Sequence, residues 1–212
     1  MLFRSEHLCY GNWTKIPDKG YDMLPRTFWS WDLGSMNCIA NWASKNPLYK
    51  YFVGGNTWIN FWEDKKNVYE NEGFVLYSLQ PRHGFNVLFP KILIDFIKTK
   101  KLKWFIRLHP AMINQYAEFE AFFIKEDISH LINFKEANEL PLPLLLKKCL
   151  IHVTNSSGTT IEAALLSKKT IVVHEVGETY YKKLISDGIV KYIPIDERFE
   201  ERFYLFLNKY EN

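Results

Sequence analysis

The stretch from Leu150 to Val173, LIHVTNSSGTTIEAALLSKKTIVV, constrains the fold more than any other part of the chain. It begins with an apolar, β-favouring run, Leu150 to Thr154, and continues with the turn residues Asn155 to Gly158. A helix-compatible segment from Thr159 to Ser167 follows, and a second apolar run, Thr170 to Val173, ends the stretch. Strand, tight turn, helix and strand in this order form the βαβ unit of a parallel sheet.

The same alternation extends over residues 73–212, where apolar strand-like runs and helical patterns follow one another. We expect further strands at 74–79, 104–108, 128–134 and 189–193, and helices at 86–98, 111–124, 141–148, 178–186 and 197–208. This pattern predicts an α/β domain with a doubly wound, Rossmann-like parallel sheet. In the usual strand order 3-2-1-4-5-6, the strands that begin at Phe74 and Leu150 are neighbours at the switch in strand order, where ligands bind.

The lead segment, residues 1–64, has a different character. Six of the seven tryptophans lie before Glu63. A helix is expected at 32–44, a strand at 49–53 and a turn at Gly54-Gly55-Asn56, which is too little for a sheet of its own. We therefore interpret this segment as an aromatic-rich partial domain. It either packs on the domain that follows or is the remnant of a larger first domain that needs a missing half or a partner chain. The polar run at 65–73 is the expected linker.

Composition narrows the class of protein. The formal net charge of +3 is too small to indicate a nucleic-acid partner. Three widely spaced cysteines suggest reduced thiols rather than disulfides or a zinc site, and histidines and carboxylates lack metal-ligand spacing. No apolar run is long enough to span a bilayer. We expect a cytoplasmic protein without a metal or cofactor, associated with a membrane at most peripherally, at its inner face.

The turn after the central strand carries the main candidate site. Hydroxyls, a glycine and unpaired N–H groups at a helix start suit a phosphate. A single serine that caps the helix is the alternative, but one cap does not explain so many hydroxyls. Glu162, in the first helical turn, either favours the helix dipole or accepts hydrogen bonds from a ribose diol. The candidate donor-binding residues here are Thr154, Ser156, Ser157, Gly158, Thr159 and Glu162.

Other candidates follow neighbouring strands at the same rim. His109 precedes a proline that favours an extended backbone, and Arg107 stands two residues earlier. As a cation or donor, His109 would hold a phosphate or help a leaving group depart, which makes it the catalytic candidate. Arg82 and His83 would touch phosphate or an acceptor, and His174 and Glu175 would contact a base or sugar. Simple solvent exposure is the alternative for these four.

Three motifs are absent, and each absence weakens one class of enzyme. The chain has no G-x-x-x-x-G-K-[ST] loop of P-loop hydrolases and no G-x-G-x-x-G dinucleotide fingerprint. It also lacks the G-x-S-x-G elbow of serine hydrolases.

Two motifs resemble those of the nucleotide-binding half of GT-B glycosyltransferases. They are Arg107-Leu108-His109-Pro110 and Thr154 to Ala163. The resemblance is strongest to bacterial sialyltransferases, polysialyltransferases and capsule Kdo transferases, whose HP and SS/ST motifs contact CMP. It implies that His109, Ser156 and Ser157 bind the donor. The S-x-G-x-x-x-E-A pattern is also similar to non-hydrolysing UDP-N-acetylglucosamine 2-epimerases and teichoic acid glycerophosphotransferases. Val53 to Thr57 resembles their GNP segment, with threonine in place of proline.

The resemblance implies a metal-independent glycosyltransferase, or its donor-binding half. It would transfer a sugar from a nucleotide donor, CMP-linked by this likeness, to a glycan acceptor in surface polysaccharide or lipopolysaccharide synthesis. The general base would come from elsewhere, because the first domain is incomplete. Two alternatives stay open. One is an enzyme similar to the UDP-sugar 2-epimerases, and the other is a non-catalytic nucleotide-binding module that needs a partner chain.

Overall fold

The computed structural model describes residues 25–63, 73–81, 83–100 and 102–208. The chain divides into two compact units, Met1–Lys66 and Asn67–Asn212. The predicted linker and the candidate Arg82 lie outside the described residues, apart from Gly73 at the linker's end. No helix within the described ranges is long and apolar enough to cross a membrane.

Within the described residues 25–63, the first unit contains one βαβ element and a short helix. Its elements are β1 (Thr27–Ser30), α2 (Leu33–Ala43), β2 (Lys50–Val53) and α3 (Thr57–Glu63). The predicted helix and strand are confirmed. The expectation that this segment has too little for a sheet of its own was wrong, because β2 pairs in parallel with β1 and the two strands form a small sheet. One face of that sheet packs on α2 through a core of Phe28, Ile39, Trp42, Ala43 and Tyr49.

The glycine turn after β2 is fixed by local packing. A Cβ at Gly54 would lie 2.1 Å from the indole ring of Trp29, so only glycine fits under this side chain. Gly55 has a φ of +77°, which favours glycine. The side chain of Asn56 then accepts hydrogen bonds from the N–H groups of Trp58 and Ile59, which caps α3.

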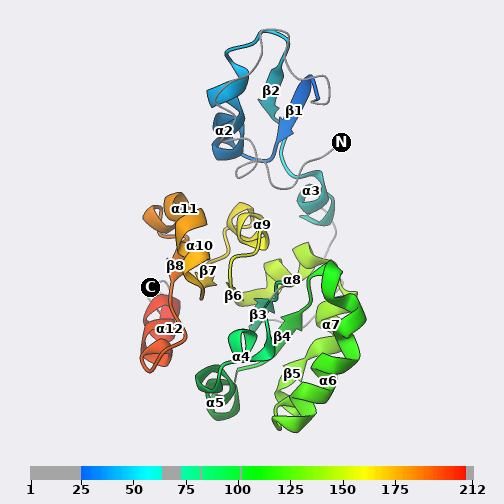
Figure 1. Ribbon diagram of the computed structural model, residues 1–212, viewed down its shortest axis with the longest axis vertical. Coiled ribbons are helices and arrows are strands. Elements are labelled where there is room, and N and C mark those ends of the chain that lie inside the picture. The colour runs from blue at the N-terminus through cyan, green and yellow to red at the C-terminus, as the bar shows by residue number, and fades with distance from the viewer. Residues whose placement is uncertain (1–24, 64–72, 82, 101, 209–212) are drawn as a thin grey trace. The chain divides into compact units, whose positions relative to one another are not determined.

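The second unit is built on a six-stranded parallel sheet (Figure 1). Its strands are β3 (Phe74–Ser78), β4 (Trp104–Arg107), β5 (Ile132–Asn133), β6 (Cys149–Thr154), β7 (Thr170–Val172) and β8 (Val190–Tyr192). The order is β5-β4-β3-β6-β7-β8, which is the predicted order 3-2-1-4-5-6. The doubly wound fold is therefore confirmed, and β3 and β6 are the neighbours at the switch.

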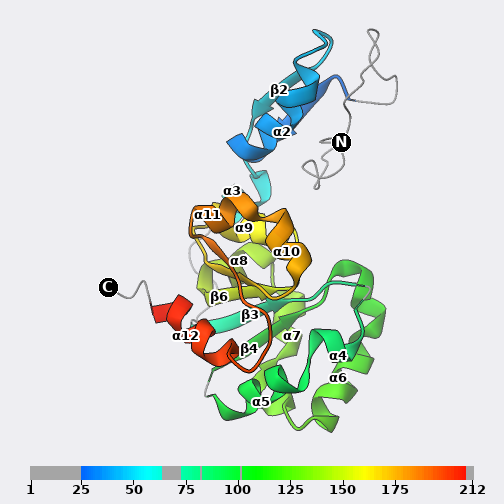
Figure 2. The same ribbon diagram turned by 60° about the vertical axis from the view of Figure 1, so that its left-hand side comes forward.

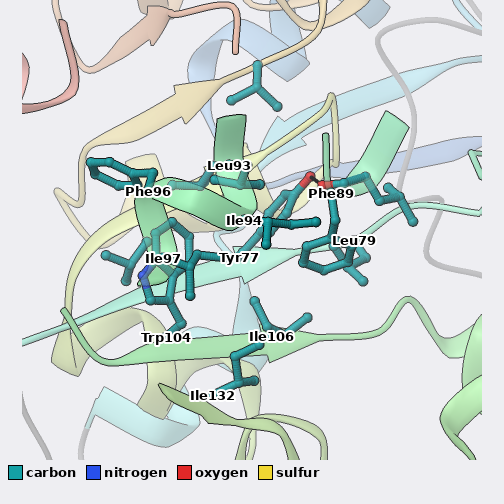
Figure 3. Packing of buried hydrophobic residues seen from close by; sticks show 14 of the residues in the cluster. Tyr77, Leu79, Phe89, Leu93, Ile94, Phe96, Ile97, Trp104, Ile106 and Ile132 are labelled. Carbon is teal, nitrogen blue, oxygen red and sulfur yellow. Dashed lines mark hydrogen bonds between the residues drawn. The ribbon is translucent and has the colours of Figure 1, made fainter. Parts of the chain in front are cut away.

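Helices cover both faces of this sheet (Figure 2). They are α4 (Phe85–Leu88), α5 (Lys91–Thr99), η1 (Pro110–Gln115), α6 (Tyr116–Lys125), η2 (Ser129–Leu131), α7 (Phe134–Glu139), α8 (Leu142–Lys148), α9 (Thr159–Leu165), α10 (Glu175–Tyr180), α11 (Lys182–Ser186) and α12 (Phe199–Asn208). Residues of β3 alternate between the two faces. Val75 and Tyr77 join the larger core, and Phe74 and Leu76 join the smaller one. Figure 3 shows Tyr77, Trp104 and Ile106 packed against side chains of α5 in the larger core.

Three predicted helices differ from those observed. The helix expected at 111–124 begins with the 3-10 helix η1 and becomes an α-helix only at Tyr116. The helix expected at 86–98 is broken into α4 and α5, because Phe89 leaves the helical region ahead of Pro90, with φ −133° and ψ 67°. The helix expected at 178–186 begins earlier, at Glu175, and is interrupted at Tyr181. His174 and Glu175 therefore lie at the start of a helix rather than in an open loop.

Candidate functional site

The ends of β3 and β6 are tied together at the switch point by buried hydrogen bonds. Ser78 and Thr154 face each other in the register of the two strands, and the Thr154 hydroxyl donates to the Ser78 carbonyl at 2.8 Å. The Tyr77 hydroxyl lies 3.1 Å from Oδ1 of Asn155 and 2.9 Å from the Leu88 carbonyl. Because these groups are buried, the turn after β6 has a fixed position relative to β3.

The hydroxyls of this turn bond mostly within the protein. The Ser157 N–H donates to Thr154 Oγ1 at 3.2 Å, and Ser157 Oγ lies 3.1 Å from Thr159 Oγ1 and 3.3 Å from the Thr159 nitrogen. The Tyr181 hydroxyl donates to the carbonyls of Ser157 at 2.7 Å and Ser156 at 3.2 Å. Burial raises the pKa of Tyr181 to about 12, so this hydroxyl keeps its proton. These internal hydrogen bonds therefore fix the shape of the turn.

Gln80 is a site residue that the sequence analysis missed. Its Oε1 accepts from the Ser156 N–H at 2.7 Å and from the Ser156 hydroxyl at 2.9 Å. This carboxamide oxygen occupies the place where an anionic oxygen would meet the same two donors. The two residues are separated by 76 positions, and no local pattern indicates the contact. Only the placement of the two residues after the neighbouring strands β3 and β6 could have pointed to it.

His109 lies at the rim with an exposed side chain, as predicted. Its Nδ1 accepts the N–H of Ala111 at 3.1 Å, which caps η1. Since an imidazole nitrogen that accepts carries no proton, the neutral ring holds its proton on Nε2. His109 therefore presents an Nε2–H donor without needing a positive charge.

Arg107 and Glu162 are engaged below the rim. Nη1 of Arg107 donates to the carbonyls of Ala137 at 2.6 Å and Leu140 at 2.7 Å, which ties β4 to the end of α7. Burial lowers the pKa of Arg107, and the charge of Glu162 opposes this shift. Glu162 is itself buried in the first turn of α9. This environment favours a structural role for both residues over direct contact with a ligand.

His83 and His174 come together, although they follow different strands. Their ring centroids are 5.4 Å apart, with the ring planes tilted by 45°. Nδ1 of His174 accepts the N–H of Val176 at 3.2 Å and caps α10, in the same way that His109 caps η1. Desolvation, and then the charge of His174, lower the pKa of His83. Glu175 is exposed in the first turn of α10.

A separate groove of about 630 Å³ surrounds the edge strand β5. Its lining comes from β4, α6, η2, β5 and the start of α7, and it includes none of the candidate residues named above. In the described part of the chain, no group of three or more His, Cys, Asp or Glu side chains is arranged to hold a metal ion.

Solved structures share this fold. A UDP-GlcNAc 2-epimerase from Neisseria meningitidis, bound to UDP-GlcNAc, matches with a TM-score of 0.59 and 19% identity over 87% of this chain and 53% of its own. MnaA from S. aureus, solved with UDP, matches at 0.56 and 16%, over 86% and 51% of the two chains. The wall teichoic acid polymerase TagF matches at 0.51 and 12%, over 87% and 48%.

The second unit has a Rossmann-like α/β fold that matches structures of the GT-B type. The chain spans about half the length of the solved structures that it matches. No protein-family model and no curated protein matches it. At these identities the likeness establishes the fold, and the nucleotide sugars named above belong to the other proteins.

Proposed function

We propose that the chain is the donor-binding half of a nucleotide-sugar enzyme, and that it binds the donor at the switch point between β3 and β6. One observation carries the proposal. In a GT-B-type sheet, Ser156, His109 and His174 are positioned beside the carboxyl ends of β6, β4 and β7, where open α/β sheets bind ligands.

The chemistry that suits these groups is transfer of a sugar away from a phosphate. Negative charge grows on that phosphate as the glycosidic bond breaks, and fixed N–H and O–H donors stabilise it. His109 supplies one such donor, with its proton held on Nε2 by the bond to Ala111. The acceptor hydroxyl of the glycan needs a base, which we expect from a part of the enzyme outside this unit.

The first unit supports the idea of a further half or a partner chain. A sheet of two parallel strands is marginal without additional layers. Its face opposite α2 carries Trp29 and Phe52, which contact each other with centroids 5.3 Å apart and are 39% and 42% exposed. Aromatic side chains of this kind are enriched in protein interfaces. We therefore propose that this face packs against the rest of the enzyme.

The identity of the nucleotide separates two versions of the function. The HP and SS motifs favour a CMP-linked donor and a transferase of surface polysaccharide or lipopolysaccharide synthesis at the inner face of the membrane. A UDP-sugar 2-epimerase is the second candidate, and it is favoured by matched structures that contain UDP or UDP-GlcNAc. A nucleotide-binding module without catalysis is the third.

Calorimetric titration of the full chain with CMP, UDP and UDP-GlcNAc tests the proposal. Tighter binding of CMP supports the transferase, and tighter binding of UDP supports the epimerase. Incubation with UDP-GlcNAc, followed by analysis for its 2-epimer, then distinguishes an active epimerase from a binding module. Absence of binding by all three nucleotides would refute the proposed function. His109→Ala should weaken nucleotide binding about tenfold, since it removes one donor to phosphate.

A further inference from the structure

The contact between His83 and His174 is not explained by packing in the core. The two residues follow β3 and β7, which lie on either side of β6 in the sheet. Both side chains are partly exposed at the carboxyl-end rim, and their ring centroids are 5.4 Å apart. Two imidazole rings, tilted by 45°, are therefore in contact next to the turn that follows β6.

The position of this pair relative to Ser156 is fixed from both sides. Gln80, three residues before His83, bonds to Ser156. On the other side, a Cβ at Gly177, in the helix that His174 caps, would lie 2.6 Å from the Asn155 carbonyl oxygen, so α10 lies directly against the turn. The pair and Ser156 consequently border the same short section of the rim.

The hydrogen bonding of His174 favours an anion over a metal ion. Its Nδ1 lone pair accepts the Val176 N–H, so the proton of the neutral ring is on Nε2. A metal ion would need a lone pair at Nε2, and breaking the cap to provide one costs about 1 kcal/mol. An anion requires only the Nε2–H that is already present.

The electrostatics of the pair point the same way. The charge of His174 opposes protonation of His83. Burial, and then the charges of Glu178, Glu175 and Asp196, raise the pKa of the Tyr192 phenol. Two imidazolium rings at this distance repel each other, and an anion bound between them would remove that repulsion.

We propose that His83 and His174 form a two-imidazole clamp that binds one phosphate group. Its assignment to the phosphate of a nucleotide sugar rests on the proposed function. In that setting, the clamp and Ser156 contact the phosphate around the carboxyl end of β6, and His109 approaches it from the side of β4.

Three variants of the full chain isolate this clamp. His174→Asn keeps an oxygen that can cap α10 in place of Nδ1 and removes the Nε2–H. His83→Phe keeps the ring contact and removes both nitrogens. His130→Gln alters an exposed histidine in η2, close to the separate groove, and serves as the matched control.

Histidine signals in NMR are followed while inorganic pyrophosphate, and separately UDP and CMP, is added. We expect the His83 and His174 signals to shift with pyrophosphate, and either clamp variant to weaken its binding about tenfold, with His130→Gln unchanged. Unshifted His83 and His174 signals, or pyrophosphate binding that survives both clamp variants, would overturn the clamp.

The titrations with UDP and CMP distinguish a failure of the clamp from a failure of the proposed function. Pyrophosphate binding to the two histidines without UDP or CMP binding leaves the clamp standing and removes the nucleotide-sugar function. Nucleotide binding that is unaffected by His83→Phe and His174→Asn leaves the function standing and removes the clamp. If neither pyrophosphate nor nucleotide binds, both are wrong.

Discussion

Single hydrogen bonds hold the candidate site together, and the Tyr181 hydroxyl makes two of them, to the carbonyls of Ser156 and Ser157. Tyr181→Phe removes this buried donor and leaves two carbonyl oxygens without it. We expect a loss of about 1 to 2 kcal/mol in the free energy of unfolding and weaker nucleotide binding, since the turn loses its attachment. Urea unfolding of both proteins measures the first effect. An unchanged unfolding midpoint would contradict this role for the hydroxyl.

A second residue-scale prediction concerns His152, which is fully buried in β6. Its Nδ1 lies 3.1 Å from Thr170 Oγ1, and burial lowers its pKa to about 3. In the unfolded chain the ring titrates near its ordinary value of about 6.5, so below that pH the unfolded state binds a proton that the folded state does not. Stability should therefore fall by at most about 1.4 kcal/mol for each pH unit between about 6.5 and about 3.

The variant His152→Leu isolates this contribution. It lowers stability at neutral pH, because Thr170 loses its partner, but it should flatten the decline in stability toward acid pH. Urea unfolding at a series of pH values measures both curves. Parallel curves for the two proteins would show that another group causes the acid sensitivity.

At the scale of residues, the sequence predicts which side chains lie at the rim of the sheet. It predicts their contacts and their roles less well. Position after a strand was enough to predict that His109 is exposed at the carboxyl-end edge. The bond from Gln80 to Ser156 and the carbonyl contacts of Arg107 join residues 30 to 76 positions apart. Such contacts depend on side-chain placement in three dimensions, and no spacing within the chain encodes them.

At the scale of elements, the close approach of α10 to the turn after β6 depends on Gly177. A Cβ at Gly177 would lie 2.6 Å from the Asn155 carbonyl oxygen and 2.9 Å from Val172 Cβ. Gly177→Ala should push the helix away from the turn and destabilise the fold by about 1 to 3 kcal/mol. Gly158→Ala is the matched control, since a Cβ there has no neighbour within 4 Å and the backbone is helical. Thermal unfolding compares the two variants, and equal midpoints would refute the close-approach explanation.

Helices and strands are predictable from the sequence where the hydrophobic periodicity and the length of a segment indicate the same type of element. β3, β4 and β6 are buried apolar runs, and their sequence left little choice. The break before Pro90 is not evident from the sequence, because proline is tolerated early in a helix even though it restricts the backbone of the preceding Phe89. Helix α7 was overlooked because its six residues, FKEANE, are too few to display a helical period.

On the scale of the whole molecule, the two units differ in the size of their hydrophobic cores. Within residues 25–63 the first unit buries a cluster of five hydrophobic residues, whereas the six-stranded sheet has hydrophobic cores on both faces. We expect residues 67–212 to fold alone with a cooperative melt, and residues 1–66 to lack one, because a two-stranded sheet cannot bury enough apolar surface. Circular dichroism of the two fragments checks this. A cooperative transition in the shorter fragment would contradict it.

The bond between Gln80 and Ser156 also sets a threshold for any molecule that would use Ser156. Such a molecule must exchange two existing hydrogen bonds rather than add two new ones, so an uncharged oxygen gains almost nothing by entering. Hydrogen bonds to an ionised oxygen are about twice as strong, and only these outcompete the amide. Under the proposed function, Gln80 would therefore favour the phosphate of a nucleotide sugar over a free neutral sugar at Ser156.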